Sequence, residues 1–201
     1  MAADEDLLDR LRAGDEVAFA ELVERYHTRL VRLARSFVAN GEVAEDVAQE
    51  TWLAVVRGIE RFEGRSSLRT WLFRICANRA RSTGAHEHRM FSADLQEAAV
   101  DPDRFDPGGA WASPPADWVD AIDDRLEAAV LAEHARRAID ELPEQQRQVV
   151  TLRDVEGLSS KEVCEVLSIS QANQRVLLHR GRSRIRSALE HKARGGQSCG
   201  S

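Results

Sequence analysis

Apolar residues recur at intervals of three and four along most of this chain, which is the period of an amphipathic α-helix. The clearest run places apolar side chains at positions 19, 22, 23, 26, 30, 33 and 37, after the capping residue Asp15 and before Asn40 and Gly41. The same pattern predicts further helices over residues 4–13, 42–61, 67–81 and 142–157, one that begins at Ile122, and a pair within residues 158–190.

The periodicity is lost between residues 91 and 121, where acidic residues, prolines and two glycines dominate. This composition is typical of a linker between domains. The sequence therefore predicts an all-α fold with two small helical domains joined by an acidic flexible linker. The predicted parts are a first domain at 1–90, the linker at 91–121, a second domain at 122–192, and a disordered tail at 193–201.

The pair of helices within residues 158–190 has the features of a helix-turn-helix. Ser159 and Glu162 are spaced as a capping box, and Ser170 can cap the second helix after a very short turn. The outer face of that second helix is small, polar and rich in arginine, which suits a DNA major groove. A solvated basic helix in a bundle is the alternative interpretation.

The helix predicted over residues 42–61 is apolar on one broad face. Asp46, Gln49, Glu50 and Leu53 line the opposite face, and no lysine or arginine accompanies them there. One interpretation is an acidic surface in contact with water. The other is a docking face for a basic partner helix.

The helix that follows Ser66 and Ser67 places Trp71, Arg74, Asn78 and Arg81 along one stripe. Aromatic rings stack on bases, arginine binds phosphate, and an amide can contact a base edge, so the stripe indicates a surface for single-stranded nucleic acid. The alternative is that Trp71 belongs to the core. Further along the helix, His86 and His88 lack a nearby cysteine or carboxylate at helical spacing, which argues against a metal site.

Composition narrows the class of protein. The 201 residues carry a net charge of −6, yet arginine is concentrated in two blocks, at 57–89 and 175–194. We therefore expect the protein to reach DNA as part of a larger assembly.

No apolar run approaches the length of a membrane span, and the acidic N-terminus is unlike a signal peptide. Three widely spaced cysteines, Cys76, Cys164 and Cys199, favour a reduced cytoplasmic compartment.

Taken in order, these segments resemble bacterial RNA polymerase sigma factors of the sigma-70 family, in the two-domain extracytoplasmic-function (ECF) group. The resemblance covers about residues 17–89 and 122–191. Its most specific stretches are AEDVAQETWLAVV (44–56), FEGRSSLRTWLFRICANRA (62–80) and LPEQQRQVVTLRDVEGLSSKEVCEVLSIS (142–170).

The resemblance implies a protein that binds the beta-prime and beta subunits of core RNA polymerase and directs promoter-specific initiation. It implies recognition of the minus-thirty-five and minus-ten elements, nucleation of DNA melting, control by an anti-sigma factor, no cofactor and no enzymatic activity. Polymerase binding would use Asp46, Gln49, Glu50 and Leu53. Minus-ten binding would use Phe62, Arg65, Ser67, Trp71, Arg74, Asn78 and Arg81. Minus-thirty-five binding would use Lys161, Ser170, Gln171, Asn173, Gln174, Arg175, His179, Arg180 and Arg182.

Several positions in the second helix of the pair depart from the family pattern. Gln174 stands where a core-facing valine is usual, and Leu177 stands where a basic residue is common. Ala172 and Asn173 replace a Gly-Thr-like pair. Gln174 would either hydrogen-bond the preceding turn or reach the DNA edge.

Two other classes compete with a sigma factor. An autonomous helix-turn-helix regulator would also need a basic recognition helix, but the net acidity and the acidic stripe argue against it. A helical enzyme using His86 and His88 lacks paired carboxylates, a phosphate-binding loop and metal-ligand spacing.

Overall fold

The computed structural model describes the backbone of residues 2–91 and 125–196, and the side chains of residues 6–84 and 132–190. Every regular element in these ranges is helical, so the all-α prediction is confirmed. The chain forms two compact units: Met1–Leu95 with Thr151–Ile169, and Gln96–Val150 with Ser170–Ser201. The predicted linker lies outside the described residues apart from its first position, and the predicted domain limits stay a prediction.

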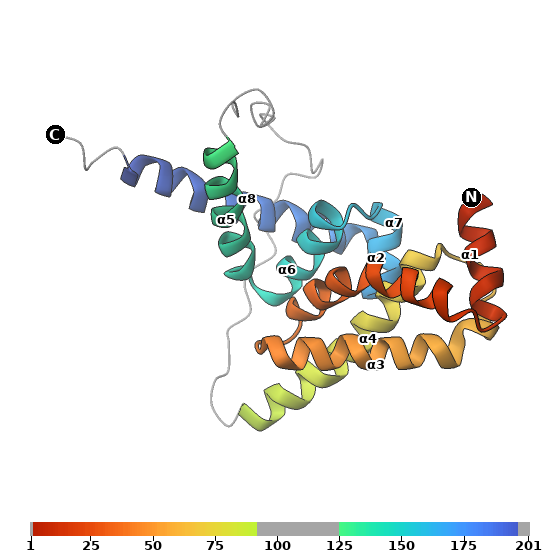
Figure 1. The fold of residues 1–201 in the computed structure, drawn as a ribbon. Helices are drawn as coiled ribbons and strands as arrows, with labels where there is room; N and C mark the ends of the chain where they lie inside the picture. Colours follow the sequence, from red (N-terminus) through yellow and green to blue (C-terminus); the bar gives the residue numbers. More distant parts are fainter. Residues whose placement is uncertain (1, 92–124, 197–201) are drawn as a thin grey trace. The chain divides into compact units, whose positions relative to one another are not determined.

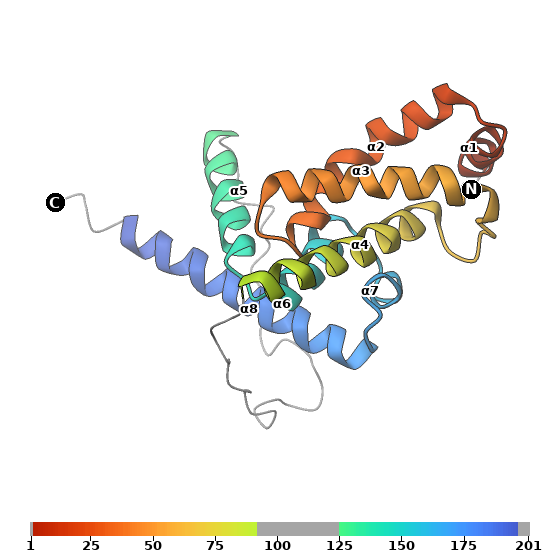
Figure 2. The same cartoon turned by 90° about the horizontal axis from the view of Figure 1, so that it is seen from below.

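The first unit is built mainly from four consecutive helices (Figure 1). They are α1 (Ala2–Arg12), α2 (Glu16–Arg35), α3 (Gly41–Gly58) and α4 (Leu68–Phe91), with a 3-10 turn at Ile59–Arg61. Helices α2, α3 and α4 pack against one another in pairs, and α1 packs against α2 and the 3-10 turn. The unit also contains a π-helical turn, Thr151–Val155, and α7 (Ser160–Leu167), which lies beside α4 (Figure 2).

Local capping fixes where these helices begin. The Asp15 carboxylate accepts hydrogen bonds from the backbone N–H groups of Val17 and Ala18, at 2.8 and 3.1 Å. Asn40 was expected to stop a helix, and its side chain also starts α3 by accepting from the N–H of Glu42 at 2.9 Å. These oxygens satisfy donors that have no partner inside the helix.

The core of the first unit lies between α2, α3 and α4. The side chains buried there include Leu22, Leu30, Leu33, Val47, Val55, Leu72, Phe73 and Cys76. In α4, Leu68 and Leu72 are buried, whereas Ile75 is only half-buried. Phe73 and Cys76 are buried as well, because α4 packs against both α2 and α3 and so buries more than one stripe of its surface.

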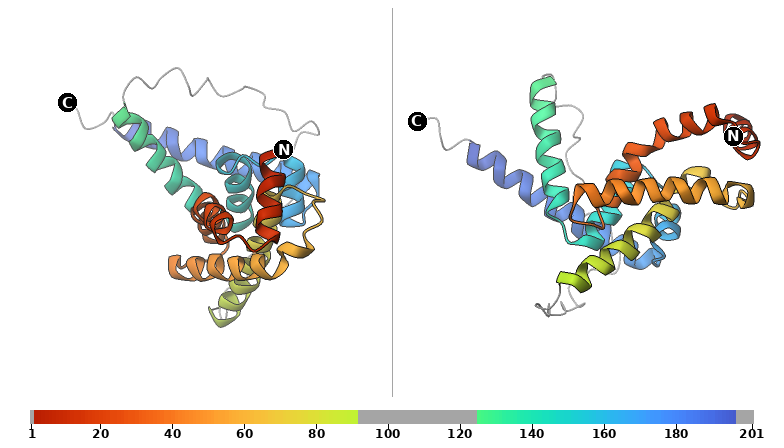
Figure 3. Two further views of the ribbon diagram at one scale, coloured as in Figure 1. Left: turned by 45° about the vertical axis from the view of Figure 1, so that its right-hand side comes forward. Right: turned by 60° about the horizontal axis from the view of Figure 1, so that its bottom comes forward.

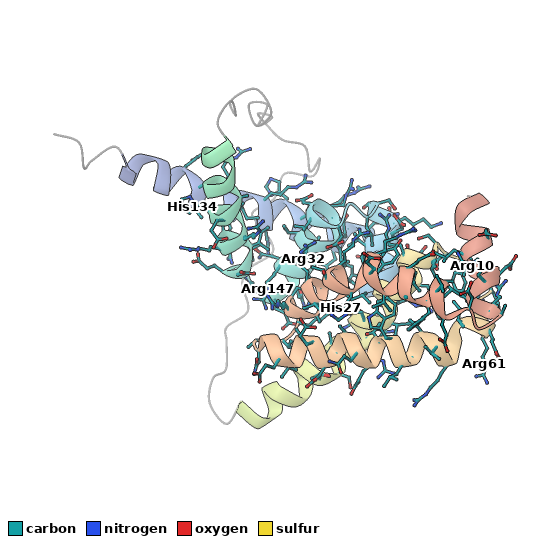
Figure 4. All side chains as sticks on the ribbon, viewed as in Figure 1. Arg10, His27, Arg32, Arg61, His134 and Arg147 are labelled. Atoms are coloured by element: carbon teal, nitrogen blue, oxygen red, sulfur yellow. The ribbon has the colours of Figure 1, made fainter. Side chains whose placement is uncertain are left out.

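A polar link joins α2 to α3 through His27, which is labelled in Figure 4. Its Nδ1 accepts from the Trp52 indole N–H at 3.3 Å, and its Nε2 lies 3.2 Å from the Glu45 carboxylate. A neutral imidazole satisfies both contacts when its proton is on Nε2. Trp52 also meets Phe19 edge to face at 5.8 Å, so this corner is fixed by polar and aromatic contacts.

The second unit contains α5 (Arg125–Asp140), α6 (Glu144–Val150) and α8 (Gln171–Gly196). Helix α8 packs along both α5 and α6 (Figure 3). It continues to Gly196, although the sequence predicted a tail from residue 193. Ala193 and Arg194 are strong helix formers, so the helix extends past the predicted limit.

We predict that Gly84→Ala destabilises the first unit. A Cβ there would lie 2.9 Å from the backbone carbonyl oxygen of Phe37, which cannot move aside as a side chain would. Overpacking costs about 1–3 kcal/mol and alanine returns about 1 kcal/mol of helix propensity, so we expect a net loss of up to about 2 kcal/mol in urea denaturation.

Gly41→Ala is the matched control, because its Cβ would lie 3.5 Å from the flexible guanidinium of Arg35. This variant should keep or slightly raise the free energy of unfolding. Equal stability of the two variants would contradict the close approach of α4 to the end of α2.

Candidate functional site

The acidic face of α3, defined by Asp46, Gln49, Glu50 and Leu53, is exposed in the structure. The opposite side of the same helix is buried against α2 and α4. Leu53 is 56% exposed and the neighbouring Val56 is 55% exposed, so two large apolar side chains lie among the carboxylates. A mixed acidic and apolar surface on a rigid helix is suited to docking another macromolecule.

The expectation that this face has no basic partner is wrong for Glu50. The guanidinium Nη1 of Arg79, on α4, donates to the Glu50 carboxylate at 2.9 Å. The two residues are 29 positions apart, so the pairing could not be found from spacing along one helix. The pair is exposed and therefore contributes little to stability, and it leaves the carboxylate accessible.

The loop before α4 presents Arg65 and turns Phe62 inward. The Arg65 side chain is 86% exposed and pairs with Glu63 at 3.1 Å. The Phe62 ring is buried against Trp71, with ring centroids 5.0 Å apart. The prediction that Phe62 contacts DNA is therefore corrected, because its side chain packs inward against Trp71 and supports the loop.

Arg12 fixes the same loop from α1. Its Nη2 donates to the backbone carbonyl of Phe62 at 2.7 Å, across 50 residues of sequence. This contact could not be predicted from the sequence, because nothing local relates an arginine in α1 to a carbonyl after α3. The backbone of the loop is thus attached to the body of the unit at its first residue.

Helix α4 brings the rest of the predicted stripe to one surface. Arg74, Asn78 and Arg81 are exposed, and Trp71 is half-buried as a partial core residue. Arg81 Nη1 donates to the Asn78 side-chain oxygen at 3.1 Å, so these two side chains lie together. Ser67 caps the helix by accepting from the N–H of Thr70 at 3.1 Å. The result is a basic and amide-bearing surface beside an aromatic ring.

Cys76 belongs to the core rather than to this surface. Its thiol is buried and donates to the backbone carbonyl of Leu30 at 3.5 Å. Burial raises the pKa of the Cys76 thiol to about 12, and a hydrogen bond with Thr51 lowers it by less. A reactive thiolate beside Arg74 and Arg79 is therefore excluded at neutral pH.

The capping box predicted at the start of α7 is confirmed. Ser159 Oγ accepts from the N–H of Glu162, and the Glu162 carboxylate accepts from the N–H of Ser159 at 2.8 Å. The helix ends at Ser168, whose φ of 57° is left-handed. The turn was predicted but this conformation was not, because it is uncommon for a residue other than glycine.

The predicted cap of α8 is also confirmed, since Ser170 Oγ accepts from the N–H of Asn173 at 3.2 Å.

The predicted minus-thirty-five residues in α7 and α8 differ in exposure. Arg180 and Arg182 are half-buried. The exposed members are Lys161, Ser170, Gln171, Asn173, Arg175 and His179.

Gln174 is 1% exposed, so the prediction that it contacts DNA is corrected. It lies on the inner side of α8, as do Leu177 and Gly181, which are also buried. At Gly181 this side approaches α6 so closely that a Cβ would lie 2.7 Å from the Val150 side chain. A buried amide cannot reach a base edge without leaving this core, so Gln174 belongs to the packing of the second unit.

Other kinds of site receive no support from the described residues. Among them, no group of three or more histidine, cysteine or acidic side chains is placed to bind a metal ion. His86 and His88 lie in the last part of α4, and Cys199 lies after α8; the side chains of all three are outside the described ranges. Across the described part of the chain, no helix is both long enough and apolar enough to span a bilayer.

Comparison with known protein families matches both halves of the chain. The sigma-70 region 2 pattern matches residues 22–85, and the sigma-70 region 4 pattern matches residues 133–185. The first matched segment contains the acidic face of α3 and most of the exposed surface of α4. The second contains α7 and most of α8.

Two solved structures share the fold. One is CnrH in complex with the cytosolic domain of CnrY, with a TM-score of 0.60 and 24% identity, covering 94% of this chain and 98% of that chain. The other is the sigma factor RpoE in complex with the anti-sigma factor NepR from Bartonella quintana, with a TM-score of 0.60 and 19% identity, covering 86% and 96%. At these identities the likeness concerns the fold alone.

Two relatives whose family is known align with this chain over nearly its whole length. The ECF RNA polymerase sigma-E factor of Escherichia coli (strain K12) is 30% identical over 188 residues, which cover 93% of this chain and 94% of that protein. The RNA polymerase sigma-H factor of Pseudomonas aeruginosa is 32% identical over 187 residues, with the same coverage. The chain therefore belongs to the extracytoplasmic-function group of the sigma-70 family of RNA polymerase sigma factors.

Proposed function

We propose that this protein is an initiation factor that binds core RNA polymerase and directs it to promoters. It recognises the minus-thirty-five and minus-ten elements and nucleates DNA melting, and it is neither an enzyme nor a cofactor-binding protein. Its similarity to RNA polymerase sigma factors over 93% of the chain carries this proposal. The site of action is the cytoplasm, where RNA polymerase and the chromosome are found.

The acidic face of α3 is the proposed docking surface for core polymerase, with the beta-prime subunit as its main partner and the beta subunit as a second. Its exposed carboxylates, Asp46 and Glu50, favour a basic partner surface through charge complementarity. Leu53 and Val56 add exposed apolar area, which a partner would remove from water. The opposite side of α3 is core, so the face is presented rigidly.

The surface of α4 and the loop before it are the proposed minus-ten site. Arginines bind phosphate, and an amide next to an aromatic ring can hold an unstacked base. Extruding a base costs a few kcal/mol, so the pocket must recover that free energy for melting to proceed. The residues proposed for this role are Arg65, Ser67, Trp71, Arg74, Asn78 and Arg81.

The outer face of α8, with Lys161 of α7, is the proposed minus-thirty-five site. The N-terminal residues of a recognition helix meet base edges, while basic side chains further along bind phosphates. The residues proposed for this role are Lys161, Ser170, Gln171, Asn173, Arg175, His179, Arg180 and Arg182. The buried Gln174 contributes by fixing the helix on its core.

An anti-sigma factor is a further proposed partner. Two proteins with the same fold were solved with such partners bound, CnrH with the cytosolic domain of CnrY and RpoE with NepR. Because the surfaces for polymerase and DNA are both exposed on this chain, an inhibitor that covers either one would block initiation.

We predict that Asp46→Lys combined with Glu50→Lys abolishes binding to core polymerase. Placing like charges across an interface costs several kcal/mol, and each 1.4 kcal/mol is a factor of ten, so the affinity should fall about a hundredfold or more. The measurement is a binding titration with purified core enzyme, together with a circular-dichroism spectrum to verify the helical fold.

The control for this charge reversal is Glu24→Lys combined with Glu141→Lys. It changes the net charge equally at exposed carboxylates outside the α3 face. It should leave the affinity within about twofold of wild type. Undiminished binding of the Asp46 and Glu50 variant would remove this face from the polymerase interface.

We predict that Arg175→Ala weakens recognition of the minus-thirty-five element. A good bidentate base contact is worth about 1–3 kcal/mol of discrimination, so the preference for the native element over a scrambled one should fall about tenfold or more. Run-off transcription from paired templates measures this ratio. Arg184→Ala, another exposed arginine of α8, is the control and should leave the ratio unchanged. An unchanged ratio for Arg175→Ala would exclude this side chain from base recognition.

A further inference from the structure

The loop between the 3-10 turn and α4 carries Arg65 to the proposed minus-ten surface, and its middle part is open to solvent. Glu63, Gly64 and Arg65 are all exposed. Gly64 has a left-handed φ of 71°, and a Cβ built on it would meet no atom within 4 Å. The position of Arg65 is therefore set by how the two ends of the loop are held.

The far end of the loop is fixed by the start of α4. Ser67 Oγ accepts from the N–H of Thr70 at 3.1 Å, and the Ser67 carbonyl accepts from the N–H of Trp71 at 3.0 Å. These bonds are local to the helix. They fix the loop where it enters α4, but the direction of its first half is set at Phe62.

Arg12 fixes the direction of the chain at Phe62. Its Nη2 donates to the Phe62 carbonyl oxygen at 2.7 Å, a distance typical of a charge-assisted hydrogen bond. The peptide group is planar, so holding this carbonyl also orients the N–H of Glu63 and the bond that leads into the loop. The Phe62 N–H donates to the Ile59 carbonyl at 3.1 Å, so both polar backbone groups of Phe62 are held.

The Phe62 side chain extends this support to Trp71. The two ring centroids are 5.0 Å apart, and Trp71 Cζ2 lies 3.4 Å from where a Cβ on Gly58 would be. The indole is thus held between the loop and the end of α3. Because Trp71 itself belongs to the proposed minus-ten surface, a shift of Phe62 would displace both the loop and this ring.

Helix α1 gives Arg12 a fixed base. Two of its three leucines are buried, so the helix is packed on the body of the unit. Arg10 Nε donates to the Asp15 carboxylate at 2.8 Å, which joins α1 to the cap of α2. The Asp9 carboxylate lies 3.4 Å from Arg12 Nη1. The guanidinium is therefore held between its own helix and the loop.

We propose that Arg12 is a positioning residue for minus-ten recognition, which acts through the loop at 62–67 and does not touch DNA itself. With its contact in place, Phe62 holds Arg65 and Trp71 in one arrangement at the surface. Without the contact, the peptide group after Phe62 can rotate and several arrangements become populated. The consequence for promoter recognition rests on the proposed function.

Loss of a positioning contact and loss of a DNA contact change recognition differently. A side chain that binds phosphate contributes equally to every sequence, so removing it weakens all promoters alike. A displaced loop loses base contacts while the phosphate contacts of α4 remain, so discrimination between bases falls. If the loop were correctly placed in a third of the molecules, the preference for the native minus-ten base would fall about threefold.

The test variant is Arg12→Met in the full-length protein, because methionine keeps a long side chain and a high helix propensity but cannot donate a hydrogen bond. Arg12→Lys is the conservative variant, since its ammonium group can still donate to the carbonyl. Arg25→Met is the matched control, because it removes the same charge at an exposed position in the middle of α2.

The first measurement is the rate of trypsin cleavage after Arg65 in the free protein, followed by mass spectrometry. Cleavage requires local opening of the loop, so the rate reports how firmly the loop is held. The Arg12→Met variant should be cut there at least about threefold faster than wild type, whereas Arg12→Lys and Arg25→Met should match wild type.

Cleavage after Arg74, inside α4, reports unfolding of the helix and should not change. An equal rate of cleavage after Arg65 in Arg12→Met and wild type would overturn the anchoring. An equal rise at Arg65 and Arg74 would overturn it as well, because Arg12 would then only stabilise the unit as a whole.

The second measurement is run-off transcription by holoenzyme reconstituted with each variant. The templates are a promoter that the wild-type holoenzyme transcribes and derivatives with one minus-ten base substituted. Arg12→Met should lower the preference for the native base at least about threefold at one position or more, and Arg12→Lys should restore it. An unchanged preference, or equal weakening on every template, would overturn the positioning role. A wild-type protein that fails to direct initiation would reject the proposed function, and trypsin cleavage would then decide the anchoring alone.

Discussion

The close packing of α2, α3 and α4 is the constraint on which the rest of the first unit depends. Small side chains such as Ala34, Ala44 and Ala80 are fully buried, and they allow the helices to approach one another closely. Each helix is therefore fixed in rotation, and its remaining face becomes a rigid surface. Helix α3 presents carboxylates and two apolar residues, whereas α4 presents arginines, an amide and a partly exposed indole. One core thus supports two surfaces of opposite charge, which we propose bind a protein partner and nucleic acid.

Opposite charge on neighbouring surfaces also explains how an acidic protein can act on DNA. With a net charge of −6, the whole molecule gains little from non-specific attraction to phosphate. Its basic residues are locally concentrated, and several are engaged by carboxylates of the same chain, as Arg79 is by Glu50 and Arg29 is by Glu156. Specific binding then depends on an assembly that aligns both DNA-binding surfaces with one promoter, which is the task of a polymerase subunit.

The sequence predicted those features that depend on near neighbours in the chain. The 3.6-residue period and the caps at Asp15, Ser159 and Ser170 located the starts of the helices to within a few residues, although α4 runs ten residues past its predicted end at 81. The acidic face of α3 was also predicted, because a single helix places residues three, four and seven apart on one side.

What could not be predicted depends on contacts between distant parts of the chain. Glu50 with Arg79 and Glu156 with Arg29 leave no trace in local spacing. Phe62 was assigned to DNA from its place in a motif, and Gln174 was expected to contact either the preceding turn or DNA. Each is buried by a neighbour that the sequence does not specify. Periodicity predicts which residues share one side of a helix, but it does not predict how far another element buries them.

We propose that this chain gives core RNA polymerase its promoter specificity, which run-off transcription with purified components can measure. Core enzyme alone and core enzyme with the protein are compared on a template that carries matched minus-thirty-five and minus-ten elements, and on templates with either element scrambled. We expect a discrete transcript only when the protein and both elements are present. Tight and specific promoter binding by the isolated protein, without any effect on initiation by the core enzyme, would contradict it.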